Sequence, residues 1–254
     1  QILVADPAAA ANPVRLPPAV LNAEWPQESG PAEPPPYHLR LSTSLAEAWH
    51  ADIGEAPSAQ QPRLPAPVVA GGLVYTMDAR NEVRAFDAAS GNEQWRADLA
   101  DNEDDDDAIA GGIAFWKGRL FATTGFAKVI ALDAATGKEI WRRTLGAPAH
   151  GAPAVDAGRV YVATINNVLY GLNAADGREV WPPHQAITEA AGVLGTAAPV
   201  AAGDSVIAAF SSGDIVAVRA STGRVIWSES LAPTRRTDEL ASVAHIRGRP
   251  VVDA

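Results

Sequence analysis

The feature that most constrains this sequence is a motif that it contains four times. The copy VIALDAATGKEIW spans residues 129–141, and the other copies span 83–95, 169–181 and 215–227. Each copy ends in Trp and has Gly four residues before it and Ala seven residues before it. Agreement at several fixed offsets indicates an internal structural repeat. The recurring residues are Trp95, Trp141, Trp181 and Trp227, with Gly91, Gly137, Gly177 and Gly223.

Each copy predicts a β-hairpin, because an apolar run enters a turn of short polar residues in which Gly can adopt a positive φ. Upstream of each hairpin, a second apolar run and then a shorter one, led by Pro in most copies, predict two more strands. Four short antiparallel strands, with Trp recurring after 46, 46, 40 and 46 residues from Trp49, predict a β-propeller blade. A β-sandwich or a β-solenoid is the alternative.

Neighbouring residues of the run 129–132 are all apolar, so both faces of the strand are expected to be covered. In a propeller the adjacent blades supply that cover. The recurring Trp is then expected to act as a wedge between blades, where its large apolar area is buried.

The order of these units predicts a partial, all-β propeller over residues 37–254. Four blades are expected at about 66–99, 109–145, 152–182 and 198–231. Residues 45–53 match only the last strand of a blade and are expected to be the strand that closes a ring, while 249–254 match the first strand of a fifth blade. Residues 1–36, rich in Pro and Ala, are interpreted as an extended or disordered leader in which Trp25 can dock locally. Either a longer gene product or two such chains would complete the ring.

Composition excludes several classes of function. A net charge of −10 argues against nucleic acid or anionic lipid as the main partner. No apolar run approaches the roughly 18 residues of a membrane-spanning helix. The absence of Cys excludes disulfides, thiolate metal sites and a Cys nucleophile. Because the sequence begins at Gln1, without an initiator Met or a signal peptide, it is interpreted as a processed or partial chain.

The motif A-x-D-A-x-T-G-x-x-x-W resembles the PQQ-type β-propeller repeat shared by quinoprotein dehydrogenases and the BamB family. The stretches 13–27, 111–142, 192–200, 210–219 and 237–253 are similar to BamB, especially to its α-proteobacterial forms. This resemblance covers nearly the whole chain and implies a PQQ-like propeller of eight blades, of which about four are present. It also implies a lipoprotein on the periplasmic face of the outer membrane, with a lipidated Cys that would precede Gln1.

The same resemblance implies a role and a partner. Family members are non-catalytic scaffold subunits of the outer-membrane β-barrel assembly machine; they bind the periplasmic POTRA domains of BamA, and unfolded outer-membrane proteins are further candidate partners. The family's two contact loops match residues 189–195 and 237–248 here. Its apolar contact positions match Ala191 and Val193, a neighbouring Arg position matches Leu194, and two acidic positions match His245 and Arg247.

Candidates for chemistry are few. The acidic run at 101–107 lacks the ligand spacing and the Gly of a Ca²⁺ loop, so a solvated loop is favoured over weak Ca²⁺ binding or contact with a basic partner. The five His residues are scattered, and the residues SSGD at 211–214 are interpreted as a turn. We therefore expect no catalytic residue, no metal and no cofactor. The alternative is a fragment of a PQQ-dependent quinoprotein dehydrogenase, whose Ca²⁺-bound quinone and common vicinal Cys pair have no match in this sequence.

Overall fold

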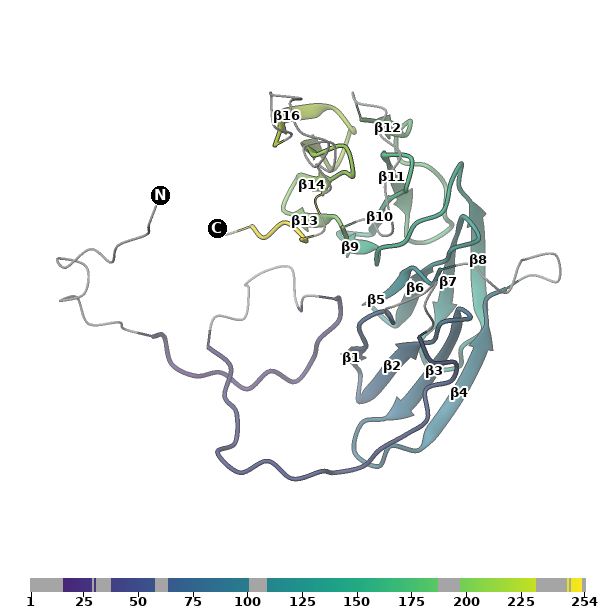
Figure 1. The fold of residues 1–254 in the computed structure, drawn as a ribbon, viewed down its shortest axis with the longest axis vertical. Helices are drawn as coiled ribbons and strands as arrows, with labels where there is room; N and C mark the ends of the chain where they lie inside the picture. The colour runs from purple at the N-terminus through teal and green to yellow at the C-terminus, as the bar shows by residue number, and fades with distance from the viewer. Residues whose placement is uncertain are drawn as a thin grey trace, which may run out of the picture.

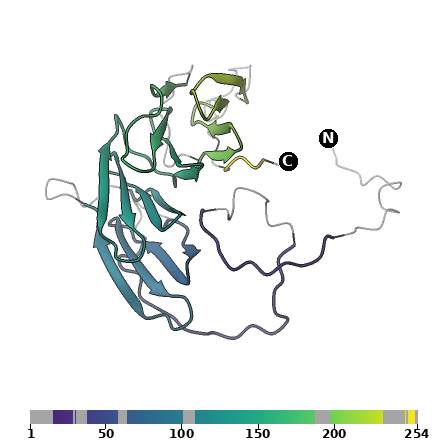
Figure 2. The same ribbon diagram turned by 180° about the vertical axis from the view of Figure 1, so that it is seen from behind.

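The computed structural model describes residues 16–28, 30, 38–57, 64–100, 109–186, 197–231, 246 and 248–252. In this part of the chain all regular structure is β, as the repeat predicts, and it forms four separate four-stranded antiparallel sheets. The sheets follow one another around an arc (Figures 1 and 2). Among the described residues, no helix has the length and apolar character needed to cross a membrane.

Every sheet is a meander whose strands lie in chain order. The first sheet contains β1 (Val68–Ala70), β2 (Leu73–Met77), β3 (Glu82–Asp87) and β4 (Glu93–Asp98). The second contains β5 (Gly112–Trp116), β6 (Arg119–Thr123), β7 (Lys128–Asp133) and β8 (Glu139–Thr144). The third contains β9 (Ala154–Asp156), β10 (Arg159–Ala163), β11 (Val168–Asn173) and β12 (His184–Gln185). The fourth contains β13 (Val200–Ala202), β14 (Ser205–Ala209), β15 (Asp214–Arg219) and β16 (Val225–Ser230).

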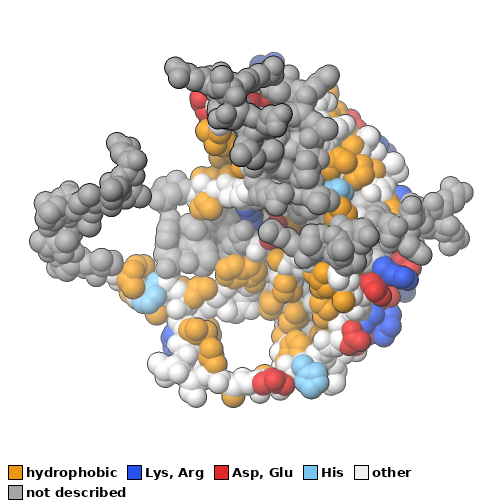
Figure 3. Space-filling model, in the orientation of Figure 1, with side chains coloured by type: hydrophobic (Ala, Val, Ile, Leu, Met, Phe, Trp, Pro, Cys, Tyr) orange, Lys and Arg blue, Asp and Glu red, His pale blue; other side chains and the backbone are white. Residues whose placement is uncertain are grey.

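The arc has an inner and an outer edge. The first strands β1, β5, β9 and β13 lie on its concave side, and the outermost strands β4 and β8 on its convex side (Figure 1). Charged side chains gather along the convex edge (Figure 3), where Arg96 and Arg142 each pair with a Glu three residues earlier at 2.8 Å. Four such sheets, ordered from the inside outwards, are the blades of a partial β-propeller.

The repeated turn has the geometry that its residues predict. Asp133 Oδ1 accepts hydrogen bonds from the Thr136 N–H at 2.9 Å and the Thr136 hydroxyl at 2.7 Å. Gly137 follows with φ of 71°, and its N–H donates to the Asp133 carbonyl at 2.8 Å. The backbone part of this pattern recurs in the other blades: Gly91, Gly177 and Gly223 have positive φ, and each donates its N–H to the carbonyl four residues earlier. The conformational freedom of Gly therefore helps to reverse the chain in each blade.

The outer strand of the third blade differs from the sequence expectation. The repeat predicts a strand ending at Trp181, but β12 is only two residues long and begins three residues later, at His184. Pro182 and Pro183 separate Trp181 from β12, and neither has an N–H to donate to β11. The other three copies have no Pro after their Trp, which explains why the ladder is interrupted in this blade alone.

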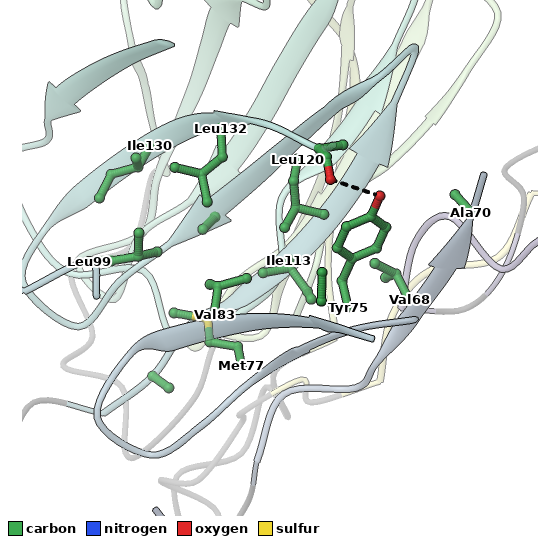
Figure 4. Packing of buried hydrophobic residues seen from close by; sticks show 14 residues of the cluster. Val68, Ala70, Tyr75, Met77, Val83, Leu99, Ile113, Leu120, Ile130 and Leu132 are labelled. Atoms are coloured by element: carbon green, nitrogen blue, oxygen red, sulfur yellow. Dashed lines mark hydrogen bonds between the residues drawn. The ribbon is translucent and has the colours of Figure 1, made fainter. Parts of the chain in front are cut away.

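The core lies between the blades. Three clusters of buried apolar side chains occupy the three junctions, each joining residues of two neighbouring sheets. Figure 4 shows the cluster between the first two blades, in which the hydroxyl of Tyr75 donates to the carbonyl of Ala134 at 3.2 Å. In β7 all four residues from Val129 to Leu132 are at most 1% exposed. Both faces of this strand are covered, as the unbroken apolar run predicts.

The recurring Trp residues lie at these junctions. The indole of Trp95 packs on Gly137 of the next blade, and its Nε1–H donates to the Ala134 carbonyl at 3.0 Å. The same pair of contacts, to the turn Gly and to the Ala three residues before it, recurs at the other described junctions: Trp141 with Gly177 and Ala174, and Trp181 with Gly223 and Ala220. Trp227 lies in β16, the outermost strand of the last described sheet, and is 45% exposed.

Two expected strands are absent from the described residues. Residues 45–53 form no strand, and neither do 249–252. A strand requires a hydrogen-bonded neighbour, and no described strand pairs with either segment. Trp49 nevertheless packs on Gly91 and donates from Nε1 to the Ala88 carbonyl at 3.0 Å. It thus makes the contact with the first blade that an outermost strand of a preceding blade would make.

Candidate functional site

The two sides of the blades carry different connections. Because each sheet begins at its innermost strand and has four antiparallel strands, the outermost strand ends on the side where the innermost strand began. We call this the connection side, since the chain passes there from one blade to the next. The turns between second and third strands lie on the same side. The repeated Gly turns lie on the opposite side.

The residues predicted to contact a partner belong to two of these connections. Ala191, Val193 and Leu194 follow β12, whereas His245 and Arg247 follow β16; all five lie outside the described residues, as does the acidic run 101–107. The described residues that flank the two connections are Ala186 and Ala197, and Leu231 and Ile246. The structure thus defines the base of each predicted loop.

A buried polar contact joins the third and fourth blades close to Ala186, one of the residues that flank the first predicted loop. Asn167 has φ of 61° in the turn after β10 and is 1% exposed. Its side-chain oxygen accepts hydrogen bonds from the Ser211 N–H at 3.1 Å and the Ser211 hydroxyl at 2.8 Å. Its carbonyl accepts from the N–H of Ala186, three residues before the first predicted loop, at 2.9 Å. One Asn therefore joins two blades and the segment that leads to the loop.

Ser211 belongs to a tight turn, as the sequence indicates. The Gly213 N–H donates to the Phe210 carbonyl at 3.1 Å, and Gly213 has φ of 87°. The hydroxyl of Ser211 bonds to an Asn and that of Ser212 to Asp214 at 2.8 Å. These bonds give 211–214 a structural role.

A groove of about 310 Å³ lies beside the same base, between β12 and the outer part of the fourth blade. His184 of β12 lines it from the third blade, and residues of β15 and β16 line it from the fourth. Partial burial of His184 lowers the pKa of its imidazole. The sequence analysis missed this groove, although Pro182 and Pro183 could have indicated it. Residues lining the groove include His184, Ala186, Phe210, Ile215, Val225 and Glu229.

The other described residues offer little catalytic chemistry. No group of three or more His, Asp or Glu side chains that could hold a metal ion occurs in the described ranges. His150 lies between β8 and β9, and burial lowers the pKa of its imidazole. Asp87 and Asp204 accept hydrogen bonds from Ser90 and Ser221, which lower the pKa of these exposed carboxyls. These bonds lie in turns on the side opposite the connections, whereas the unrepeated loops of the connection side are suited to binding a partner.

Four blades, each running from an innermost to an outermost strand and with a Trp at each junction, define a repeat β-propeller of the PQQ-like class. The family model for the outer membrane protein assembly factor BamB matches residues 41–105 and 79–254. The chain belongs to this family.

Individual relatives agree with the family match. A BamB from Nitrosomonas eutropha is 27% identical over 215 residues, which cover 85% of this chain and 50% of that protein. The crystal structure of BamB from Moraxella catarrhalis superposes with a TM-score of 0.65 at 20% identity, over 83% of this chain and 59% of that one. A quinohemoprotein alcohol dehydrogenase from Comamonas testosteroni superposes with a TM-score of 0.67 at 19% identity, over 84% of this chain and 42% of that one. At these identities the two structures show a shared fold alone. The chain spans about half the length of the curated relatives it matches.

Proposed function

We propose that this chain contributes four blades to a non-catalytic scaffold subunit of the outer-membrane β-barrel assembly machinery. The observation that carries the proposal is the family match over residues 41–105 and 79–254, together with relatives named as outer membrane protein assembly factors. The subunit would assist the assembly and insertion of β-barrel proteins, with unfolded outer-membrane proteins as further partners. It would work at the periplasmic face of the outer membrane, held by a lipid anchor outside this chain.

The proposed partner surface consists of the loops 189–195 and 237–248, which would bind the POTRA domains of BamA. Support comes from connectivity, because these segments follow the outermost strands of two neighbouring blades and begin on the connection side. The Asn167 contacts and the adjacent groove would give the first loop a rigid, partly apolar base. Val193 and Leu194 would extend that apolar surface.

A titration of the full chain against BamA POTRA domains from a related source tests both parts of the proposal. The variant Val193→Asp/Leu194→Asp places two charges in the proposed contact. Its matched control is Leu41→Asp/Leu45→Asp, which places the same charges on side chains that are 73% and 72% exposed and distant in sequence. We expect saturable binding that the first variant loses and the control keeps. Equal binding by both variants would reject the loops, and no binding by any chain would reject the scaffold role.

A quinoprotein dehydrogenase fragment is the second candidate, because the Comamonas testosteroni enzyme shares the fold. Adding PQQ with Ca²⁺ and an alcohol or sugar, and following the reduction of a dye, distinguishes the two. The scaffold proposal expects no dye reduction above that of the cofactor alone.

A further inference from the structure

Part of the leader is docked on the concave side of the blades. The sequence predicts an extended or disordered segment in which Trp25 can dock locally, and Trp25 forms an antiparallel bridge with Val69 of β1. The Trp25 N–H donates to the Val69 carbonyl at 2.6 Å, and the Val69 N–H donates to the Trp25 carbonyl at 2.9 Å. The side chain of Glu24 accepts a hydrogen bond from the Gly71 N–H at 3.2 Å. In both ribbon views the dark purple segment ends beside β1 (Figures 1 and 2).

The next two residues reach the next two blades. The Pro26 carbonyl accepts from the Phe115 N–H of β5 at 2.7 Å. The carboxamide of Gln27 donates to the Val155 carbonyl of β9 at 3.1 Å and accepts from the Val155 N–H at 3.3 Å. Gln27 is only 6% exposed. Its carboxamide makes the two hydrogen bonds to Val155 that the peptide groups of a neighbouring strand would otherwise make. Three consecutive residues therefore bond to three consecutive blades.

These contacts use backbone groups that the blades leave unpaired. The innermost strands β1, β5 and β9 each have a strand neighbour on one side only. Their inner edges carry N–H and C=O groups that can pair with an extended chain. Pro26 suits its position because only its carbonyl is needed there. The segment is also folded for this contact, since the Gly30 N–H donates to the Gln27 carbonyl at 2.8 Å and the Trp25 indole packs on Gly30.

The site has room beyond Gln27. A cavity of about 450 Å³ opens between the leader and the second, third and fourth blades. Ala201 and Ala202 of β13 line it, next to Gln27 and Trp116. The charged residues that line it are Lys117, Glu24 and Asp156.

We propose that the inner edges of β1, β5 and β9 form a binding site for an extended peptide with Gln at the position that faces Val155, and that the leader occupies this site in cis. The bridge at Val69 sets the register, the Phe115 N–H requires only a carbonyl, and Val155 selects a carboxamide that can donate and accept. The leader is then an intramolecular ligand that ties the first three blades together.

A peptide titration of the full-length chain tests this proposal. The probe is a fluorescent peptide with the sequence of residues 18–30, PAVLNAEWPQESG. The variant Trp25→Pro/Gln27→Ala removes the N–H that bonds to Val69 and both bonds to Val155. The control Pro26→Ala keeps the carbonyl that Phe115 needs. A tethered segment competes at an effective concentration on the order of millimolar, so the double variant should bind the peptide at least about tenfold more tightly than the wild type or the control.

Two results would overturn the site. One is a double variant with a wild-type circular dichroism spectrum that does not bind the peptide. The other is a wild-type chain that binds as tightly as the double variant, since the peptide would then be bound elsewhere. A probe peptide carrying Gln27→Ala should bind the double variant more weakly than the original sequence does. Equal binding would show that Val155 does not select the carboxamide.

Hydrogen exchange gives a second measurement that needs only a mild variant. In Gln27→Ala the Val155 amide should exchange about tenfold faster, as expected for the loss of one hydrogen bond of typical net strength. The Ala174 amide bonds to the Gly158 carbonyl in the same blade at 2.9 Å and serves as the internal control. Unchanged exchange at Val155, or equal acceleration at both amides, would contradict a specific contact with the leader.

Discussion

The contact between a Trp and the Gly turn of the next blade can be tested by adding one methyl group. A Cβ at Gly137 would lie 2.5 Å from Cε3 and 2.7 Å from Cδ2 of Trp95. Carbon atoms in contact are ordinarily about 3.5 to 4.0 Å apart, so in Gly137→Ala the indole must move by roughly 1 Å. That shift also strains the hydrogen bond from Trp95 Nε1 to the Ala134 carbonyl, which is 3.0 Å long.

Gly118 provides a matched control. Its φ is 76°, against 71° at Gly137, and a Cβ there would have nothing within 4 Å. Both Ala variants should lose about 1 kcal/mol through the left-handed backbone conformation. Only Gly137→Ala should lose a further 1 to 3 kcal/mol, approximately the range measured for overpacking in protein interiors.

Urea denaturation of the two full-length variants measures this difference. We expect the free energy of unfolding to fall by about 1 kcal/mol in Gly118→Ala and by about 2 to 4 kcal/mol in Gly137→Ala. In the background of Trp95→Leu, the effect of Gly137→Ala should shrink towards that of the control, because the bulky indole is gone. Equal destabilisation by the two Gly variants would show that the packing of Trp95 on Gly137 contributes nothing measurable.

Three other predictions follow from burial, buried hydrogen bonds and titration. Trp181→Ala should reduce the free energy of unfolding by about 3 to 5 kcal/mol, since Trp181 is 4% exposed, and Trp227→Ala should reduce it by much less, since Trp227 is 45% exposed; urea denaturation in parallel compares them. Asn167→Ala should destabilise by about 2 to 4 kcal/mol in the same assay because it removes the acceptor of two buried hydrogen bonds from Ser211, whereas Asn167→Asp keeps the acceptor and should lose less. Burial raises the pKa of Tyr75 and Tyr161 to about 12 from the usual value of 10.0, so their stabilising effect should be complete below pH 10 and lost as pH rises towards 12; an absorbance titration near 295 nm in which every tyrosine ionises near pH 10 would contradict this.

The repeat unit could be predicted closely because its determinants are local. Asp133, Thr136 and Gly137 form the turn within five residues, and the unbroken apolar run in β7 predicts two buried faces. The number and order of the four described blades follow from the spacing of the copies. The resemblance to the PQQ-type repeat follows from the same motif, and the resemblance to BamB follows from stretches such as 13–27 and 237–253; the family match confirms it.

The candidate site was less predictable. Its proposed contact residues, from Ala191 to Arg247, come from the resemblance and remain a prediction, since they lie outside the described residues. The groove beside them depends on where β12 ends, and that depends on how Pro182 and Pro183 interrupt pairing with β11. The two Pro residues were visible in the sequence, but the space they leave depends on the neighbouring blade.

The sequence by itself determined the blade: its four strands, its Gly turn and the Trp that ends each copy, because hydrogen bonds and periodicities within about forty residues specify these features. Only the tertiary structure decided which Trp is buried, since Trp181 has a following blade in the described structure and Trp227 has none. Only the tertiary structure brought Gln27 to Val155, 128 residues away. The physical reason is that an unpaired N–H or C=O at a strand edge can bond to any chain of suitable shape. Which segment pairs there therefore depends on where the arc of blades places the inner strands.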